Sequence, residues 1–311
     1  MNVALLPAAL AVVLWGLSFV ATKMALAELS PMAVVIGRTL LALLFLVVIA
    51  GLRGRSLRPP VGLWPRLLLA GFLGVFLHML LQAWGLTMTT AVRTGWLIGI
   101  IPVWSALLAL VVLGEGLGRR KLAGLGLGFL GVAALLGTSG SVGPGLLPTT
   151  KGDLLILAST LNWAIYTVLG RTILARMGAL EATTIAMAVG LGMLLPFAPW
   201  QTLAQQYGSV SAAAGGAVVF VGVGCSGLAY LCWYTSLARA SASSVASLLY
   251  LEPLVTLAGG VLLLGEASVS PRRVRVCSCW LVSILCKRRI HDAGGRTGGF
   301  GRHEVSGRVA P

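Results

Sequence analysis

A carboxylate and a proline stand side by side inside one of the most apolar stretches of this sequence. Glu252 precedes Pro253 in the run LLYLEPLVTLAGG, residues 248–260. A charged acid at the middle of a membrane costs about 2.5–3.5 kcal/mol on insertion scales, so we expect it to avoid lipid. Pro253 has no amide hydrogen and disfavours helical geometry at Glu252, which predicts a helix break and a Leu249 carbonyl without its usual partner. Such a break suits a site that binds a proton or a cationic group; the alternative is an acid that only caps the break.

Arg38 is a second charge within an apolar run. It lies about seven residues after the run begins at Pro31, or roughly 10 Å along a helix. Two roles are open: contact with an anion or with Glu252, and extension of the long side chain to the outer headgroups. Lys23 and Arg93 lie near the ends of runs, where we expect them to act as membrane-surface anchors.

Neutral polar and aromatic side chains complete the candidate pathway for a substrate or a proton. His78 and Gln82 are four residues apart and share one helix face, which indicates a polar patch or a proton relay. For His78 the alternative is a packed histidine. For Gln82, and for the asparagine and tyrosines among the remaining candidates, the alternative is hydrogen bonding between helices. The remaining candidates are Asn162, Tyr166, Tyr230, Tyr234, Trp15 and Trp163.

The elements that must position these residues are membrane-spanning helices. The chain has 311 residues, of which 58% are hydrophobic and 10% charged, a balance typical of an integral membrane protein. Uncharged runs of 20 residues or more are too long for barrel strands and must close their backbone hydrogen bonds as helices. We predict spans at residues 3–23, 31–51, 66–87, 91–113, 121–138, 153–171, 181–199, 213–237 and 242–264.

The net charge of +15 is not a nucleic-acid signature. Residues 272–311 hold nine of the 23 Lys and Arg, and most of the others fall in alternate loops, without a basic face that is interleaved with aromatic residues. Ten of them lie in the loops on the side of the N-terminus and three in the opposite loops. Because cytoplasmic loops are enriched in Lys and Arg, we expect a cytoplasmic N-terminus.

Cysteine usage predicts neither a disulfide framework nor a metal site. Cys225 and Cys232 share one predicted span, and three more cysteines lie after residue 271 without spaced His or acidic partners. We therefore expect no metal and no cofactor.

The chain repeats itself. IPVWSALLALVVLGE, residues 101–115, aligns with EPLVTLAGGVLLLGE, residues 252–266, so that Pro102 matches Pro253 at an offset of 151, and both prolines are expected to break their helices. Trp15 matches Trp163 at an offset of 148. Five spans per copy is an odd number, so the two copies must cross the membrane in opposite senses. Inverted repeats of this kind are typical of alternating-access transporters with a site near the midplane.

Three ordered segments resemble the EamA family of the drug/metabolite transporter superfamily. They begin WGLSFVATKMALAELSP at residue 15, QAWGLTMTTAVRTGW at residue 82 and YTSLARASASSVASL at residue 234. The resemblance implies an all-α polytopic fold of ten helices in two inverted five-helix repeats. The first repeat is at residues 1–140, and residues 151–271 contain helices six to nine, which belong to the second. The resemblance also implies secondary transport of small metabolites such as amino acids, usually export, in a multi-pass protein of the inner membrane.

The sequence departs from this pattern after Pro271. The tenth helix should resemble residues 122–137, yet the uncharged core at residues 276–286 is only 11 residues long, against the roughly 20 that a span needs. We interpret residues 272–311 as an atypical basic tail in which a frameshift replaced a tenth helix, a hypothesis that reading the other two frames of the gene tests. The alternative is a genuine short final segment.

The leading function predicted is therefore transport, with or without proton coupling, of a small-molecule substrate across a lipid bilayer. A channel or a non-transporting membrane protein is the alternative. An intramembrane lipid-modifying enzyme is less favoured, because the six acids of residues 1–271 form no paired-carboxylate or HExxH motif. Nucleic acid is not expected as a partner, and a homodimer is left open.

Overall fold

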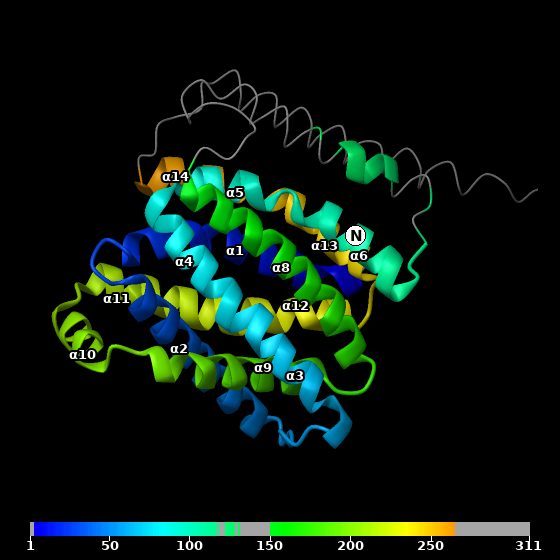
Figure 1. Ribbon diagram of the computed structural model, residues 1–311, viewed down its shortest axis with the longest axis horizontal. Coiled ribbons are helices and arrows are strands. Elements are labelled where there is room, and N and C mark those ends of the chain that lie inside the picture. Colours follow the sequence, from blue (N-terminus) through cyan, green and yellow to red (C-terminus); the bar gives the residue numbers. More distant parts are fainter. Residues whose placement is uncertain (1–2, 117, 119–121, 128–129, 131–149, 265–311) are drawn as a thin grey trace, which may run out of the picture. The chain divides into compact units, whose positions relative to one another are not determined.

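The protein is described by a computed structural model for residues 3–116, 118, 122–127, 130 and 150–264. These residues form helices connected by short turns and no strand, as predicted. Most of the predicted span 121–138 and the whole tail 272–311 lie outside the described residues. Figure 1 shows the described helices packed side by side.

Eight helical segments of the described chain are long and apolar enough to cross a membrane, and they match the other eight predicted spans. Several consist of more than one helix. The segments, with the helices of each in parentheses, are Val3–Ala25 (α1, Leu6–Ala25), Pro31–Leu52 (α2), Val61–Met88 (α3, Trp64–Gly71; η3, Phe72–Leu77; α4, His78–Met88), Ala91–Leu113 (α5, Ala91–Ile98; α6, Ile101–Leu113), Lys151–Leu174 (α8), Ala179–Phe197 (α9, Ala179–Leu194), Ala212–Leu237 (α11, Ala212–Val219; η5, Phe220–Leu228; α12, Ala229–Leu237) and Ala242–Leu264 (α13, Ala242–Ala246; η6, Ser247–Leu251; α14, Glu252–Leu264).

Local signals in the sequence fix where these helices begin. Ser30 accepts a hydrogen bond from the Ala33 amide and precedes Pro31, the first residue of α2. Thr150 and Asp153 form a capping box at the start of α8. The short helix α10, Trp200–Ser209, connects α9 to α11 and lies against the start of α2, where the Tyr207 hydroxyl donates to the Ala33 carbonyl at 2.9 Å.

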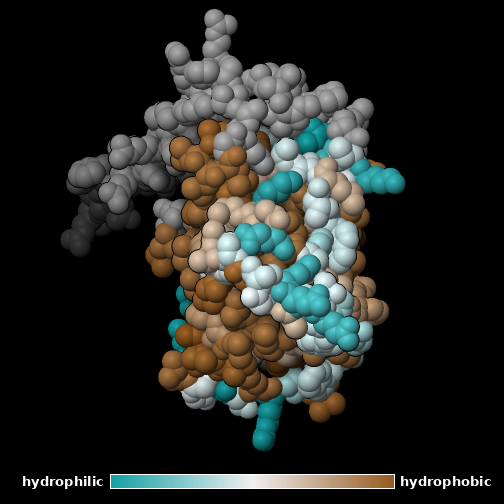
Figure 2. All heavy atoms as spheres, turned by 90° about the vertical axis from the view of Figure 1, so that its left-hand side faces the viewer, coloured by the Kyte–Doolittle hydropathy of each residue, from teal (hydrophilic) through white to brown (hydrophobic). Residues whose placement is uncertain are grey.

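Apolar side chains cover the outside of the bundle, as lipid requires. Val111 and Leu262 are each at least 80% exposed, and Val48 is 58% exposed. Figure 2 looks onto the end of the bundle at the left of Figure 1, where hydrophilic side chains form a strip beside extensive hydrophobic surface.

Glycines let the helices approach closely in the interior. A Cβ atom on Gly152 of α8 would lie 2.7 Å from the Gly85 carbonyl oxygen of α4. Gly71 of α3 and Gly190 of α9 form a similar contact, in which a Cβ on Gly190 would lie 3.0 Å from the Gly71 carbonyl oxygen. These contacts join segments from the two predicted repeats and are typical of membrane helix packing.

Two spans contain π-helical turns at their centres. η3, Phe72–Leu77, lies between α3 and α4, and η5, Phe220–Leu228, lies between α11 and α12. A π-helix is wider than an α-helix and is frequently found at functional sites. Both segments supply hydrogen-bond acceptors to side chains of other spans.

The helices are interrupted before both repeat-related prolines. α5 ends at Ile98, and α6 begins at Ile101 with Pro102 in its first turn. In the other copy the 3₁₀-helix η6 connects α13 to α14, which begins at Glu252. One detail of the prediction is wrong: Glu252 has helical dihedrals, φ −59° and ψ −44°, and its amide donates to the Leu249 carbonyl. The 3₁₀ turn provides this bond in place of the one that Pro253 cannot make.

The predicted surface anchor Arg93 is instead a buried structural residue. It is 5% exposed, and its Nε donates to Asp153 Oδ2 at 2.8 Å, while Thr89 Oγ1 donates to Asp153 Oδ1 at 2.8 Å. Lys23 Nζ donates to the Leu86 and Thr89 carbonyls at the C-terminus of α4, where a cation compensates unpaired carbonyl groups. We call this end of the bundle the Asp153 end.

Two more carboxylates cap helices at the surfaces. At the Asp153 end, Glu28 accepts hydrogen bonds from the Ser211 amide and hydroxyl, which lower the pKa of the Glu28 carboxyl because they stabilise its charged form. At the opposite end, Glu115 accepts from the Ala242 and Ser243 amides and the Ser243 hydroxyl at the start of α13. This second end, which we call the Glu115 end, also holds the bond from the Ala8 amide to Ser236 Oγ.

The two ion pairs of the described residues offer a matched stability test. Asp153→Asn removes a partner from the buried Arg93 guanidinium and should destabilise the protein by about 3–5 kcal/mol. Glu181→Gln breaks a 3.7 Å pair with Arg55, whose side chain is 63% exposed, and should cost about 0–1 kcal/mol. Thermal unfolding of both variants in detergent measures the difference. Equally small decreases in the unfolding temperature would contradict the assignment of Arg93 as a buried structural residue.

Candidate functional site

A pocket lies where the interrupted helices meet α1, α2, α4, α8 and α12. It contains about 350 Å³ of space that no atom occupies, part of it open to solvent. Its lining residues are Trp15, Ser18, Phe19, Arg38, His78, Gln82, Ile98, Ile101, Trp163, Tyr230, Leu249 and Glu252.

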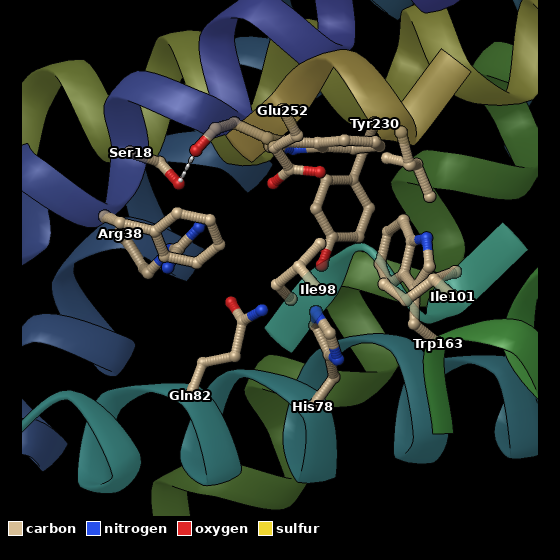
Figure 3. Close-up of a pocket in the computed structure, with 12 residues that line it drawn as sticks. Ser18, Arg38, His78, Gln82, Ile98, Ile101, Trp163, Tyr230 and Glu252 are labelled. Carbon is tan, nitrogen blue, oxygen red and sulfur yellow. Dashed lines mark hydrogen bonds between the residues drawn. The ribbon is translucent and has the colours of Figure 1, made fainter. Parts of the chain in front are cut away.

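The Glu252 carboxylate points into this pocket from the start of α14 (Figure 3). The residue is 3% exposed, and within the described chain its carboxylate makes neither a hydrogen bond nor an ion pair. Close packing fixes its backbone: a Cβ on Gly16 of α1 would lie 3.1 Å from the Glu252 carbonyl oxygen. Since a buried charge is costly without a partner, this carboxylate is suited to take up a proton or to bind a cation.

Arg38 reaches the same pocket from α2 and does not extend to the outside. It is 5% exposed, and its Nε donates to Ser226 Oγ of η5 at 2.8 Å. Within the described residues no carboxylate lies within ion-pair distance of its guanidinium. The pocket therefore contains two opposite charges that do not pair with each other.

His78 and Gln82 project into the pocket from one face of α4, as their spacing predicts (Figure 3). His78 Nδ1 lies 3.2 Å from the Ser159 carbonyl oxygen, so this nitrogen carries the hydrogen and Nε2 is left as an acceptor in the neutral ring. The Gln82 amide makes no hydrogen bond to other described residues. Both side chains are suited to hydrogen-bond a ligand.

Aromatic rings from both halves form the wall of the pocket. The Trp15 and Trp163 rings meet edge to face with centroids 5.1 Å apart, and Tyr230 contacts both rings. The π-helical turns hold two of them, because Trp15 Nε1 donates to the Cys225 carbonyl of η5 and the Tyr230 hydroxyl donates to the Gly74 carbonyl of η3. Hydrogen bonds between the halves thus fix the shape of this wall.

Three predicted site residues, Asn162, Tyr166 and Tyr234, do not line the pocket. Asn162 Nδ2 donates to the Leu73 carbonyl of η3 at 2.6 Å, a bond between helices. Tyr166 is fully buried, and its ring stacks on Tyr234 with centroids 5.3 Å apart and contacts Trp163. Their contacts are those of packing residues, and a direct role in binding is not evident from their positions.

Several lining residues were not predicted from the sequence. Leu249 and Ile98 are related by the repeat offset of 151, as are Glu252 and Ile101, so the repeat alignment could have identified the apolar members. Ser18 follows Trp15 by one turn of α1, and its hydroxyl donates to the Trp15 carbonyl. No sequence pattern marked Ser226, because its role depends on a contact with Arg38, which is 188 residues away in the chain.

No cluster of three or more His, Cys, Asp or Glu side chains that could hold a metal ion occurs among the described residues. Cys225 and Cys232 are both free thiols.

The family model described as "EamA-like transporter family" matches residues 2–137 and 150–284. The chain belongs to this family. The second match continues past residue 271, the expected end of the second repeat. This EamA-like chain is accordingly a multi-pass membrane protein of a transporter family.

Curated relatives cover most of the EamA-like chain. An uncharacterized transporter of Archaeoglobus fulgidus is 34% identical over 248 residues, 80% of this chain and 84% of its own length. A protein of Streptantibioticus cattleyicolor named "Probable terminal-alkyne amino-acid exporter" is 30% identical over 257 residues, 83% of this chain and 84% of its own length. A solved crystal structure with 22% identity covers 92% of this chain with a TM-score of 0.68, which supports the fold alone.

Thiol labelling tests whether the pocket is open to water. In a variant whose five native cysteines are replaced by serine, Gln82→Cys should react with a small charged thiol reagent, because Gln82 is half-buried in the pocket lining. Ser105→Cys is the control, since Ser105 is fully buried and does not line the pocket. Equal reactivity at the two positions would show that the pocket is not the accessible cavity.

Proposed function

We propose that the protein is a secondary transporter of small metabolites, amino acids or related compounds, that exports them by alternating access. The observation that carries the proposal is the position of the Glu252 carboxylate. It is buried and unpaired within the described chain, and it lines a pocket at a helix interruption. Intramembrane acids of this kind mark substrate and proton pathways. The amino-acid exporter among the relatives supports the substrate class and the direction.

Alternating access would rest on two inverted repeats, residues 1–140 with five predicted spans and residues 151–271 with four. The contacts at the two ends of the bundle support this arrangement. The first copy begins at the Glu115 end, where the Ala8 amide bonds to Ser236, and the second begins at the Asp153 end, where Thr150 and Asp153 start α8. Copies that begin at opposite ends can exchange the accessible side of a central site.

The conformation of the described residues favours access from the Asp153 end. Ser18, Arg38 and Gln82 lie on the halves of their membrane spans that approach this end. Toward the Glu115 end, Tyr166, Trp233 and Tyr234 are fully buried and fill the interior. We infer that this aromatic group closes the path to the Glu115 end and must separate in the opposite conformation.

Proton coupling would use Glu252. In its neutral form the carboxyl can remain buried, and in its charged form it attracts an ammonium group or another proton. His78, whose Nε2 is free to accept a hydrogen bond, lies in the same pocket and is suited to pass protons toward it. Transport of an amino acid could then be driven by the proton gradient.

We place the N-terminus and the Glu115 end in the cytoplasm and the protein in the inner membrane, on the basis of the charge bias of the loops. Arg239→Cys and Gln205→Cys test the orientation in a background without cysteine. An impermeant thiol reagent added to whole cells should label Gln205→Cys in α10 at the Asp153 end and spare Arg239→Cys in the loop before α13. Labelling of Arg239→Cys alone would show that the protein has the opposite orientation.

A channel or a non-transporting membrane protein is the alternative function, and we propose that the chain has no enzymatic activity. A channel conducts without saturation or exchange. Countertransport therefore separates the two, because preloading vesicles with unlabelled substrate accelerates entry of labelled substrate only through a carrier.

Glu252→Gln tests the proposed function directly. In proteoliposomes with a pH gradient, the full-length variant should lose about tenfold or more of its proton-driven amino-acid flux, since a hydrogen bond to a charged group is worth about 1.5–3 kcal/mol. Glu181→Gln, which alters a carboxylate outside the pocket, is the matched control and should keep its flux. Unchanged proton-driven flux in Glu252→Gln would refute the role of this residue.

A further inference from the structure

Two buried arginines of this chain have different surroundings. Arg93 and Arg38 are each 5% exposed, yet Arg93 has the Asp153 carboxylate at 2.8 Å and Arg38 has the neutral Ser226 hydroxyl at the same distance. A buried cation without a counter-charge is strongly unfavourable. Arg38 therefore requires a negative charge that the described residues do not provide.

The single bond to Ser226 leaves most of the guanidinium available. Ser226 accepts from Nε, so the two Nη groups, which make no bond to other described residues, remain on the side of the pocket. A guanidinium presents its N–H groups in a planar fork that matches a carboxylate. An incoming carboxylate would supply the charge that Arg38 lacks.

We propose that Arg38 is a carboxylate subsite, that Ser226 is its positioning residue, and that the pocket selects solutes carrying both a carboxylate and an ammonium group. The inference rests on the proposed transport function. Arg38 and Glu252 line one pocket and, among the described residues, do not pair with each other. A zwitterion between them neutralises both charges, whereas an amine without a carboxylate leaves Arg38 uncompensated.

Ser226 is needed because an arginine side chain is long enough to turn away from the pocket. The hydroxyl belongs to the π-helix η5, whose backbone lies close to α2: a Cβ on Gly222 would lie 3.1 Å from the Arg38 carbonyl oxygen. Ser226 is fully buried, so the bond is shielded from competing water. This contact holds Arg38 in place before any solute binds.

The lining of the pocket also offers apolar surface to a solute. The Trp15, Trp163 and Tyr230 rings provide the apolar surface against which its side chain would pack. The proposed selection thus depends on the charged groups of the solute, while the aromatic wall accepts an apolar side chain of the solute.

Binding of leucine and of 3-methylbutylamine, which is leucine without its carboxylate, tests the inference on the full-length protein in detergent. Intrinsic tryptophan fluorescence provides the readout, because two tryptophans line the pocket. The unmodified protein should bind leucine about tenfold or more tightly than the amine. Ser226→Ala should reduce this preference several-fold, Ser226→Thr should restore it because the hydroxyl is kept, and Arg38→Gln should abolish it.

The outcomes separate this inference from the proposed function. Equal binding of the two ligands by the unmodified protein, or a preference that Ser226→Ala and Arg38→Gln leave intact, would overturn the carboxylate subsite. An intact preference for leucine with the expected variant pattern, but without leucine flux in proteoliposomes, would support the subsite and refute transport. Thermal unfolding of the variants shows that they are folded, and the ratio of the two affinities is independent of the amount of active protein.

Discussion

A charge buried between membrane helices must be neutralised, because neither lipid nor the hydrogen-bonded interior of a helix can solvate it. This chain meets the constraint in two ways. Where a charge supports the fold, its partner belongs to the protein: Arg93 has Asp153, and Lys23 has the carbonyls at the end of α4. Where a charge lines the pocket, as with Arg38 and Glu252, no charged partner is present among the described residues. The distinction separates the packing of the bundle from its site.

The site depends on irregular helices, because the spans that surround the pocket contain π-helical turns and interruptions. A regular α-helix has no free backbone groups in its interior, so it offers side chains of other helices few partners. The π-helical turns of η3 and η5 differ: the carbonyls of Leu73, Gly74 and Cys225 accept bonds from Asn162, Tyr230 and Trp15. The interruptions before Pro102 and Pro253 open the facing side of the pocket.

The spans and many lining residues were predictable because both depend on local sequence. Apolar runs gave eight described spans, and rare polar residues within them, such as His78 and Glu252, mark the pocket. The Arg93–Asp153 pair was not predictable, since the two residues are 60 positions apart and each is ordinary at a helix end. Likewise, Ser226 resembles many other serines in membrane helices until the tertiary fold brings it to Arg38. Local periodicity contains no information on such pairings.

Matching apolar residues of the duplicated sequence line the pocket from both halves, but an acid lines it from only one. Trp15 and Trp163 occupy matching positions and meet at 5.1 Å, and Ile98 matches Leu249, so both halves contribute to the apolar wall. The position of Glu252, by contrast, is Ile101 in the first half. In the alternating access that we propose, the carboxylate would always move with the second half, because the first half has no acid at the matching position. A single acid would then give solute and proton one shared point of attachment in both conformations.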